Sequence, residues 1–186
     1  MIRTRATYAE LLAAPDHHVA ELINGELFVT PRPAIRHARA STKLGAILDA
    51  PFDSGERGES GWIFLDEPEL HFGEDVIIPD LAGWRRPRFP PEAADAAYVT
   101  VAPDWVCEVV SPRTERLDRA GKADVYAREG VAYFWLINPA VRTLEVLRLL
   151  DGRWLRLAGF SNADRVRAEP FQDFALDLAA LWWDPR

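Results

Sequence analysis

The segment Trp105-Val106-Cys107-Glu108-Val109-Val110 constrains the fold of this chain more than any other. All of its side chains except Glu108 are apolar, a pattern typical of a strand buried on both faces. A helical pattern follows over 114–128 and ends at Gly130, and a second apolar strand is expected over 131–137. Strand, helix and strand in this order form a βαβ unit, so we expect an α/β protein with a mixed sheet.

Turn and cap signals predict the other elements. Thr7 and Glu10 have the spacing of a capping box at the start of a short helix that ends near Ala14. Asn24-Gly25 and Asp151-Gly152 predict β-hairpins over 19–30 and 142–160. We also expect a helix over 34–50, strands at 62–65, 69–72, 76–78 and 81–84, a surface loop over 85–97 and a short helix over 175–183. For a chain of 186 residues, the simplest expectation is a single domain over 1–186.

Charge and cysteine content exclude several classes of protein. The net charge is −7, and the whole acidic surplus lies within residues 51–100, which argues against a protein that coats nucleic acid non-specifically. One cysteine, Cys107, allows no disulfide framework and no cysteine zinc cluster. No signal peptide or membrane span is recognisable, so we expect a cytoplasmic protein with no membrane partner.

Two carboxylates are candidate metal ligands. Glu108 is the only charge in its strand, and a buried carboxylate must be paired, metal-bound or protonated. Asp80 follows Pro79 between two apolar strand segments. An Asp and a Glu supply the hard oxygen ligands that Mg²⁺ or Mn²⁺ prefers. The alternatives are an ordinary turn at Asp80 and a pairing of Glu108 with an arginine from a neighbouring helix.

Lys122 is a candidate catalytic residue because the chain fills nearly every other cationic position with arginine. Lys43 and Lys122 are its only lysines. Asp118, Lys122 and Tyr126 are spaced four residues apart and therefore share one flank of the helix. Lys122 either forms a surface ion pair with Asp118, or points at the metal site and stabilises charge on phosphorus.

Several other polar residues have an ordinary structural interpretation as well as a functional one. Glu21 lies on the first hairpin, where a strand carboxylate is usually solvated. His37 opens the helix over 34–50, where a lone histidine is more often a hydrogen-bonding or capping group than a ligand. The candidate phosphate contacts are basic residues of a kind that more commonly forms a solvated helix face. They are Arg36, Arg39, Lys43, Arg113, Arg116 and Arg119.

The order of these residues resembles the Uma-two family, a bacterial group described as putative restriction endonucleases within the PD-(D/E)XK nuclease superfamily. The matching positions are Glu21 to Glu26, His37, Pro79-Asp80, Glu108 to Pro112, Asp118, Lys122, Tyr126, Gly130-Val131 and Trp135. The resemblance implies a restriction-endonuclease-like core: a mixed central sheet flanked by helices, plus the N-terminal hairpin. It further implies that Asp80 and Glu108 bind the metal, that Glu21 assists, and that Lys122 completes the catalytic set, with His37, Asp118 and Tyr126 in support. The superfamily lysine usually lies two residues after the acid, where this chain has Val110.

Two functions remain open at this point. The first is a Mg²⁺- or Mn²⁺-dependent endonuclease that hydrolyses phosphodiester bonds in DNA and acts as a homodimer. The second is a catalytically inactive interaction or regulatory module that keeps the nuclease fold, since a fold does not fix a function. The acidic surplus within residues 51–100 favours the second, because a DNA-cleaving surface should be locally basic.

Overall fold

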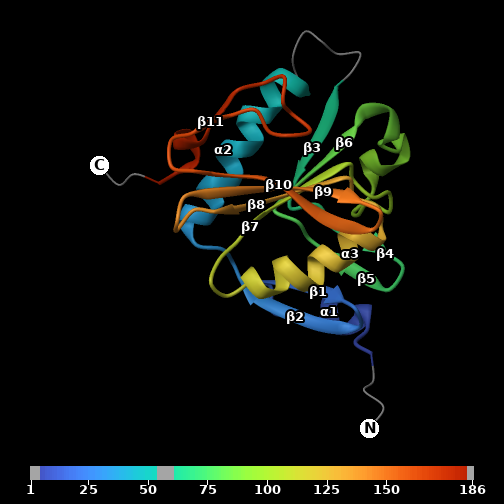
Figure 1. The fold of residues 1–186 in the computed structure, drawn as a ribbon. Helices are drawn as coiled ribbons and strands as arrows, with labels where there is room; N and C mark the ends of the chain where they lie inside the picture. The colour runs from blue at the N-terminus through green and yellow to red at the C-terminus, as the bar shows by residue number, and fades with distance from the viewer. Residues whose placement is uncertain (1–4, 54–60, 184–186) are drawn as a thin grey trace.

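A computed structural model describes residues 5–53 and 61–183 (Figure 1). Its helices are α1 (Tyr8–Leu12), α2 (Ile35–Phe52) and α3 (Ala123–Arg128), with a π-helix η3 (Leu117–Lys122) directly before α3 and short 3₁₀ turns η1 (Arg86–Arg88), η2 (Pro91–Asp95) and η4 (Leu178–Leu181). The strands are β1 (His18–Ile23), β2 (Glu26–Pro31), β3 (Trp62–Asp66), β4 (Leu70–Phe72), β5 (Asp75–Ile77), β6 (Leu81–Arg85), β7 (Trp105–Val109), β8 (Tyr133–Asn138), β9 (Thr143–Leu150), β10 (Arg153–Ser161), β11 (Arg165–Val166) and β12 (Leu176–Asp177).

The central sheet is mixed, as the sequence predicts. It has six strands in the order β10-β9-β8-β7-β6-β3, in which β7 and β8 pair in parallel and every other neighbouring pair is antiparallel. The parallel pair is connected through η3 and α3, which is the expected βαβ unit. The predicted α/β class with a mixed central sheet is therefore confirmed.

The N-terminal hairpin belongs to a second sheet, of order β2-β1-β5-β4. Asn24 and Gly25 both have positive φ, at 54° and 80°, which is the backbone that a two-residue Asn-Gly turn favours. Strand β5 lies in this sheet and β6 lies in the central sheet, so the chain crosses between the two sheets over Ile78, Pro79 and Asp80. This crossover carries one of the candidate site residues.

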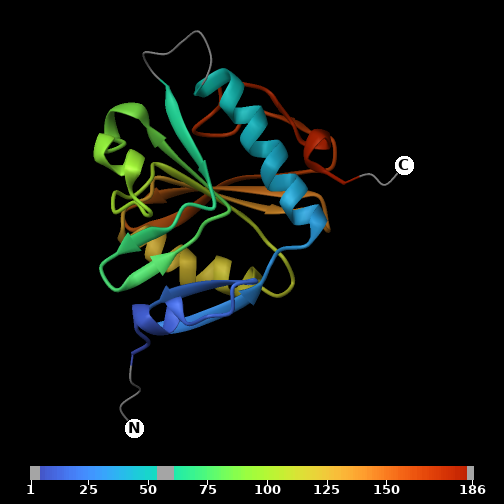
Figure 2. The same ribbon diagram turned by 180° about the vertical axis from the view of Figure 1, so that it is seen from behind.

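Two hydrophobic cores lie on opposite faces of the central sheet. Helix α2 covers one face and α3 with the hairpin sheet covers the other, as the two opposite views show (Figures 1 and 2). Along β7, Trp105, Cys107 and Val109 join the core under α2, whereas Val106 joins the core under α3. Because strand side chains alternate, Glu108 shares the α3 side with Val106 and lies opposite Cys107.

The structure corrects four expectations about local structure. The helix predicted over 114–128 is a π-helix over its middle turn, Leu117–Lys122, where Lys122 is held by Glu21 and Glu108 outside the helix. The predicted helix over 175–183 is the short strand β12 followed by the turn η4, since its apolar side chains fill the core under α2. The loop expected over 85–97 contains the turns η1 and η2. The helix expected over 34–50 is α2, which continues to Phe52 with Pro51 inside it.

Among the described residues, no helix is both long enough and apolar enough to cross a membrane.

We predict that Asp75→Ala lowers the free energy of unfolding by about 1–3 kcal/mol, because Asp75 is buried and links the hairpin to α3. Its carboxylate accepts the backbone N–H of Asn24 at 2.6 Å and an ion pair from Arg128. Urea denaturation measures the change. The control is Glu74→Ala, at an exposed neighbouring position, where we expect a change within about 0.5 kcal/mol. Equal losses in both variants would contradict this role of Asp75.

Candidate active site

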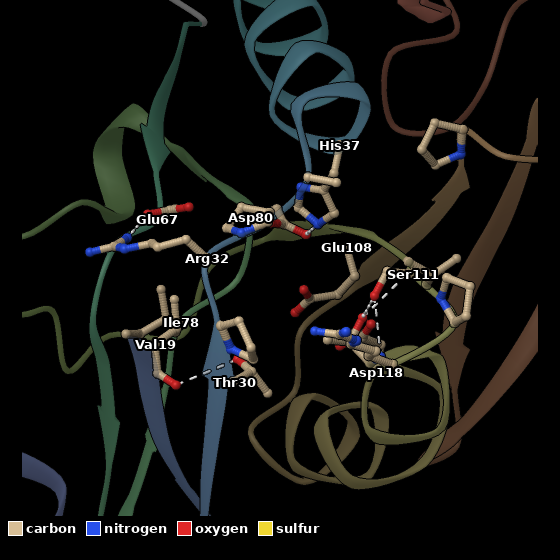
Figure 3. Close-up of a pocket in the computed structure, with 18 of the residues that line it drawn as sticks. Val19, Thr30, Arg32, His37, Glu67, Ile78, Asp80, Glu108, Ser111 and Asp118 are labelled. Carbon is tan, nitrogen blue, oxygen red and sulfur yellow. Dashed lines mark hydrogen bonds and ion pairs between the residues drawn. The ribbon is translucent and has the colours of Figure 1, made fainter. Parts of the chain in front are cut away.

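The candidate residues surround one cavity of about 560 Å³ (Figure 3). The cavity lies between the β1–β2 hairpin, the start of α2, the loop between β7 and η3, and the turn after β8. In Figure 3, His37 and Asp80 lie together above Glu108, with Asp118 on one side and Ile78 on the other. Its polar lining includes Glu21, His37, Asp80, Glu108, Asp118 and Lys122.

Lys122 lies at the centre of the buried contacts. Its Nζ is 2.9 Å from Glu21 Oε1, 3.3 Å from both oxygens of Glu108, and donates to the Ile78 carbonyl at 2.9 Å. Lys122 also lies 3.9 Å from Asp118, but the residue is 5% exposed, so the expected ion pair with Asp118 is buried and not on the surface. Burial lowers the pKa of Lys122, but the surrounding carboxylates outweigh burial and raise it well above the usual value.

Glu108 is fixed from the α3 side of the sheet. Its Oε1 accepts the Tyr126 hydroxyl at 2.6 Å, and Lys122 contacts both of its oxygens. The expected arginine partner is therefore replaced by a lysine and a tyrosine. Burial raises the pKa of Glu108 well above its usual range; Lys122 opposes this rise, and the neighbouring carboxylates add to it.

Asp80 is held by the backbone of the strand that carries Glu108. Its Oδ2 accepts the N–H of Val109 at 2.7 Å and lies 3.3 Å from His37 Nε2. Burial lowers the pKa of His37, but its hydrogen bond to Asp80 and the nearby negative charge outweigh burial and raise that pKa. His37 therefore contacts a site carboxylate, which agrees with the hydrogen-bonding role expected for a histidine near a helix start.

The π-helix brings Asp118 and Lys122 to the same wall of the cavity. Asp118 Oδ1 lies 3.9 Å from Lys122 Nζ, and both side chains are buried. Single π-turns inside helices often occur at functional sites because they redirect side chains. Burial raises the pKa of Asp118 from 3.8 to about 6, against the opposing effects of Lys122 and Thr114.

Negative charge exceeds positive charge in this cluster. Four carboxylates, Glu21, Asp80, Glu108 and Asp118, act on the single ammonium group of Lys122; Glu67 and the arginines Arg32, Arg36 and Arg113 also line the cavity. Protonated His37 would add one further positive charge. A buried surplus of this kind is relieved by protons or by a bound cation, and the raised pKa values of Glu108 and Asp118 are its signature.

The donor chemistry at Asp80 and Glu108 fits a hard divalent cation. Both supply carboxylate oxygens, and the contacts of Asp80 with other described residues fall on Oδ2, which leaves Oδ1 for a ligand. Mg²⁺ is commonly bound through one or two carboxylates, with waters completing its coordination. Within 5–53 and 61–183, no group of three or more His, Cys, Asp or Glu residues is arranged as a metal site.

Of the predicted phosphate contacts, two border the cavity and four do not. Arg36 and Arg113 line it. Arg39 lies over the Trp183 ring at 5.7 Å, and Arg119 is paired with Glu115 and Glu145. Lys43 and Arg116 are absent from the lining, and Lys43 is exposed on α2.

Sequence reasoning missed Arg32, Glu67 and the main chain of Ile78. Arg32 lines the cavity and pairs with Glu67 at 3.2 Å. Glu67 has a positive φ of 46°, which is uncommon for a residue other than glycine and often marks a functional site. The position of Arg32 between Pro31 and Pro33, directly after the hairpin, is the signal that could have identified it.

Comparisons with known proteins agree with this fold. The model of the Uma2 family, described as "Putative restriction endonuclease", matches residues 5–179. Among solved structures, the chain is similar to a putative nuclease belonging to DUF820 from Anabaena variabilis, with a TM-score of 0.75 and 21% sequence identity. That similarity covers 95% of this chain and 97% of the other. No curated protein matches the chain.

We predict that the stability of the protein falls as the pH rises from about 4 through about 6. The raised pKa of Asp118 means that the folded state binds this proton more tightly than the unfolded chain, so its contribution to stability is lost as Asp118 ionises. Asp118→Asn should flatten this dependence and be more stable than the unmodified protein at pH 7 by about 1–3 kcal/mol.

Urea denaturation at several pH values measures this effect. The matched control is Asp124→Asn, an exposed position on the following helix, which should keep the pH dependence of the unmodified protein. A residual slope in Asp118→Asn is expected from Glu108, whose raised pKa acts in the same direction. An unchanged slope in Asp118→Asn would contradict the assignment.

Proposed function

Because the chain belongs to the Uma2 family, whose members are described as putative restriction endonucleases, we propose that it is a Mg²⁺- or Mn²⁺-dependent DNA endonuclease of the PD-(D/E)XK type. The observation that carries the proposal is the convergence of Asp80, Glu108 and Lys122 on one cavity from three separate elements. Two carboxylates and a lysine are the groups that phosphodiester hydrolysis requires in this type of nuclease. A homodimer and a cytoplasmic location stay predictions.

Asp80 and Glu108 would hold the metal. A bound divalent cation supplies Lewis-acid polarisation of a phosphoryl oxygen and lowers the pKa of a bound water. Asp80 is positioned for this by Val109 and His37, and Glu108 by Tyr126, so neither carboxylate depends on the ion for its orientation.

Lys122 would stabilise the negative charge that develops on the phosphate. Its pKa is raised, so the ammonium stays charged at neutral pH. Glu21 and the Ile78 carbonyl orient it toward Glu108, and the N–H of Ile78 in turn donates to Glu21 at 2.8 Å. Fixed charges in a site shielded from water stabilise a transition state more strongly than the same charges in solution. In this proposal Lys122, on the helix after the strand, supplies the lysine that the superfamily usually has at the position of Val110.

One observation favours the alternative of a catalytically inactive module. Both oxygens of Glu108 are engaged by Lys122 and Tyr126, so a metal would have to share this carboxylate with them. A module that only binds partners would keep this network for stability alone. Cleavage and metal-binding measurements separate the two functions.

We predict that the purified protein cleaves DNA with Mn²⁺ or Mg²⁺, and that Asp80→Asn and Lys122→Met each slow cleavage by about 10²-fold or more. Lys43→Met is the matched control, since Lys43 is the other lysine and lies exposed on α2. It should cleave within about twofold of the unmodified protein. Gel assays of labelled DNA measure the rates, and circular dichroism checks that each variant is folded. Equal cleavage by Asp80→Asn would mean a contaminant or a different site.

We also predict that Mn²⁺ binds and raises the melting temperature of the unmodified protein, because a ligand of the folded state stabilises it. Asp80→Asn should lose the heat of binding in calorimetry and the rise in melting temperature. Glu74→Gln, on the exposed turn between β4 and β5, is the control and should keep both. Absence of binding to the unmodified protein would favour the non-catalytic module.

A further inference from the structure

The candidate catalytic groups are buried side chains that line a pocket, and several other residues of its lining are exposed. Glu108 is 2% exposed, Asp118 3% and Lys122 5%, and all three line the cavity of about 560 Å³. This volume is within the range of pockets that hold small molecules, roughly 300–1,000 Å³. A pocket of this volume has room for about one nucleotide unit beside the buried groups.

From this geometry we infer that the substrate enters as an unpaired nucleotide, so that single-stranded or locally unpaired DNA is the preferred substrate. The inference rests on the proposed nuclease function and narrows its substrate class. An enzyme that acts inside a pocket on a paired strand must first extrude the nucleotide, at a cost of a few kcal/mol. DNA that is already unpaired avoids this cost.

The apolar part of the lining suits a nucleobase or a sugar. Pro31 and Pro33 border the cavity from the hairpin side, and Pro112 and Pro139 border it from the loops after β7 and β8. Ala140 adds another small apolar side chain beside Pro139. Extruded bases are held in their pockets by packing against aromatic or apolar side chains, and proline rings offer an apolar surface.

The basic residues of the lining are few. Arg32, Arg36 and Arg113 line the cavity with Glu67, which pairs with Arg32. Three arginines can contact the phosphates that flank one bound nucleotide. Proteins that grip a duplex by its backbone commonly neutralise about 6–10 phosphates, and the net charge of −7 leaves little cationic surface for that. The charge distribution therefore agrees with the binding of a short unpaired DNA segment.

The test compares three labelled DNA substrates of equal length and sequence with the full chain and Mn²⁺. They are a single strand, a perfect duplex, and a duplex with a central unpaired loop. The single strand and the loop should be cleaved at least about tenfold faster than the perfect duplex, because they avoid the cost of unpairing. Cleavage of the perfect duplex at an equal or greater rate overturns the inference.

Fluorescence anisotropy of the same DNAs with Mg²⁺ tests the inference separately from catalysis. If no DNA is cleaved, the proposed function fails, but an affinity for the single strand at least about tenfold above that for the duplex still supports an unpaired occupant. Equal affinities, or no binding of either DNA, overturn it.

A variant at the cavity links these results to this site. Ala140→Trp places an indole at an exposed residue of the lining and should reduce single-strand binding and cleavage about tenfold or more without loss of stability. Ala38→Trp is the control, since Ala38 is exposed on α2 and is absent from the lining. It should behave as the unmodified protein. Unchanged single-strand binding and cleavage in Ala140→Trp would place the DNA elsewhere and overturn the inference.

Discussion

The buried ammonium group of Lys122 is the interaction on which the rest of the site depends. It joins Glu21 of the hairpin sheet to Glu108 of the central sheet, and it also binds the carbonyl of the segment that connects the two sheets. Removing one partner of a buried ion pair leaves an uncompensated charge, which typically costs about 3–5 kcal/mol. The same contact therefore holds two layers together and fixes the groups that the chemistry needs.

The crossover from β5 to β6 explains why the site lies between the sheets. Ile78 donates its N–H to Glu21 and accepts from Lys122, and two residues later Asp80 accepts the N–H of Val109. Three consecutive residues thus connect the hairpin, the π-helix and the central strand β7. An otherwise ordinary Pro-Asp bend becomes a rigid part of the site because its main chain and its side chain are both bonded.

Local signals predicted most of the fold, whereas the surroundings of the charged residues required the tertiary structure. Asn24-Gly25 and Asp151-Gly152 form the predicted hairpin turns, and the apolar run at 105–110 forms the central strand. Helical spacing placed Lys122 on the flank of Asp118 and Tyr126 but could not tell a solvated flank from a buried one. The π-helix and the short strand at 176–177 were missed because distant contacts determine both. For the same reason, the spacing of arginines on α2 could not show which of them reaches the cavity. Arg36 lines it, whereas Arg39 lies over the ring of Trp183.

The charge balance of the cavity constrains how any phosphate can approach it. Four carboxylates act on the one ammonium group of Lys122, while Glu67 and three arginines line the rest of the cavity, and an incoming phosphate diester adds another negative charge. In a region shielded from water, repulsion between like charges is screened far less than in solution. Protonation of Glu108 and Asp118 would relieve it at low pH, but that would remove the carboxylate that the metal requires. A divalent cation relieves the repulsion while both carboxylates stay ionised, and its own charge reverses the local field. The surplus of carboxylates around Lys122, of which only Asp80 belongs to the acidic block at 51–100, is thus the reason to expect that any nucleic-acid substrate binds together with a metal.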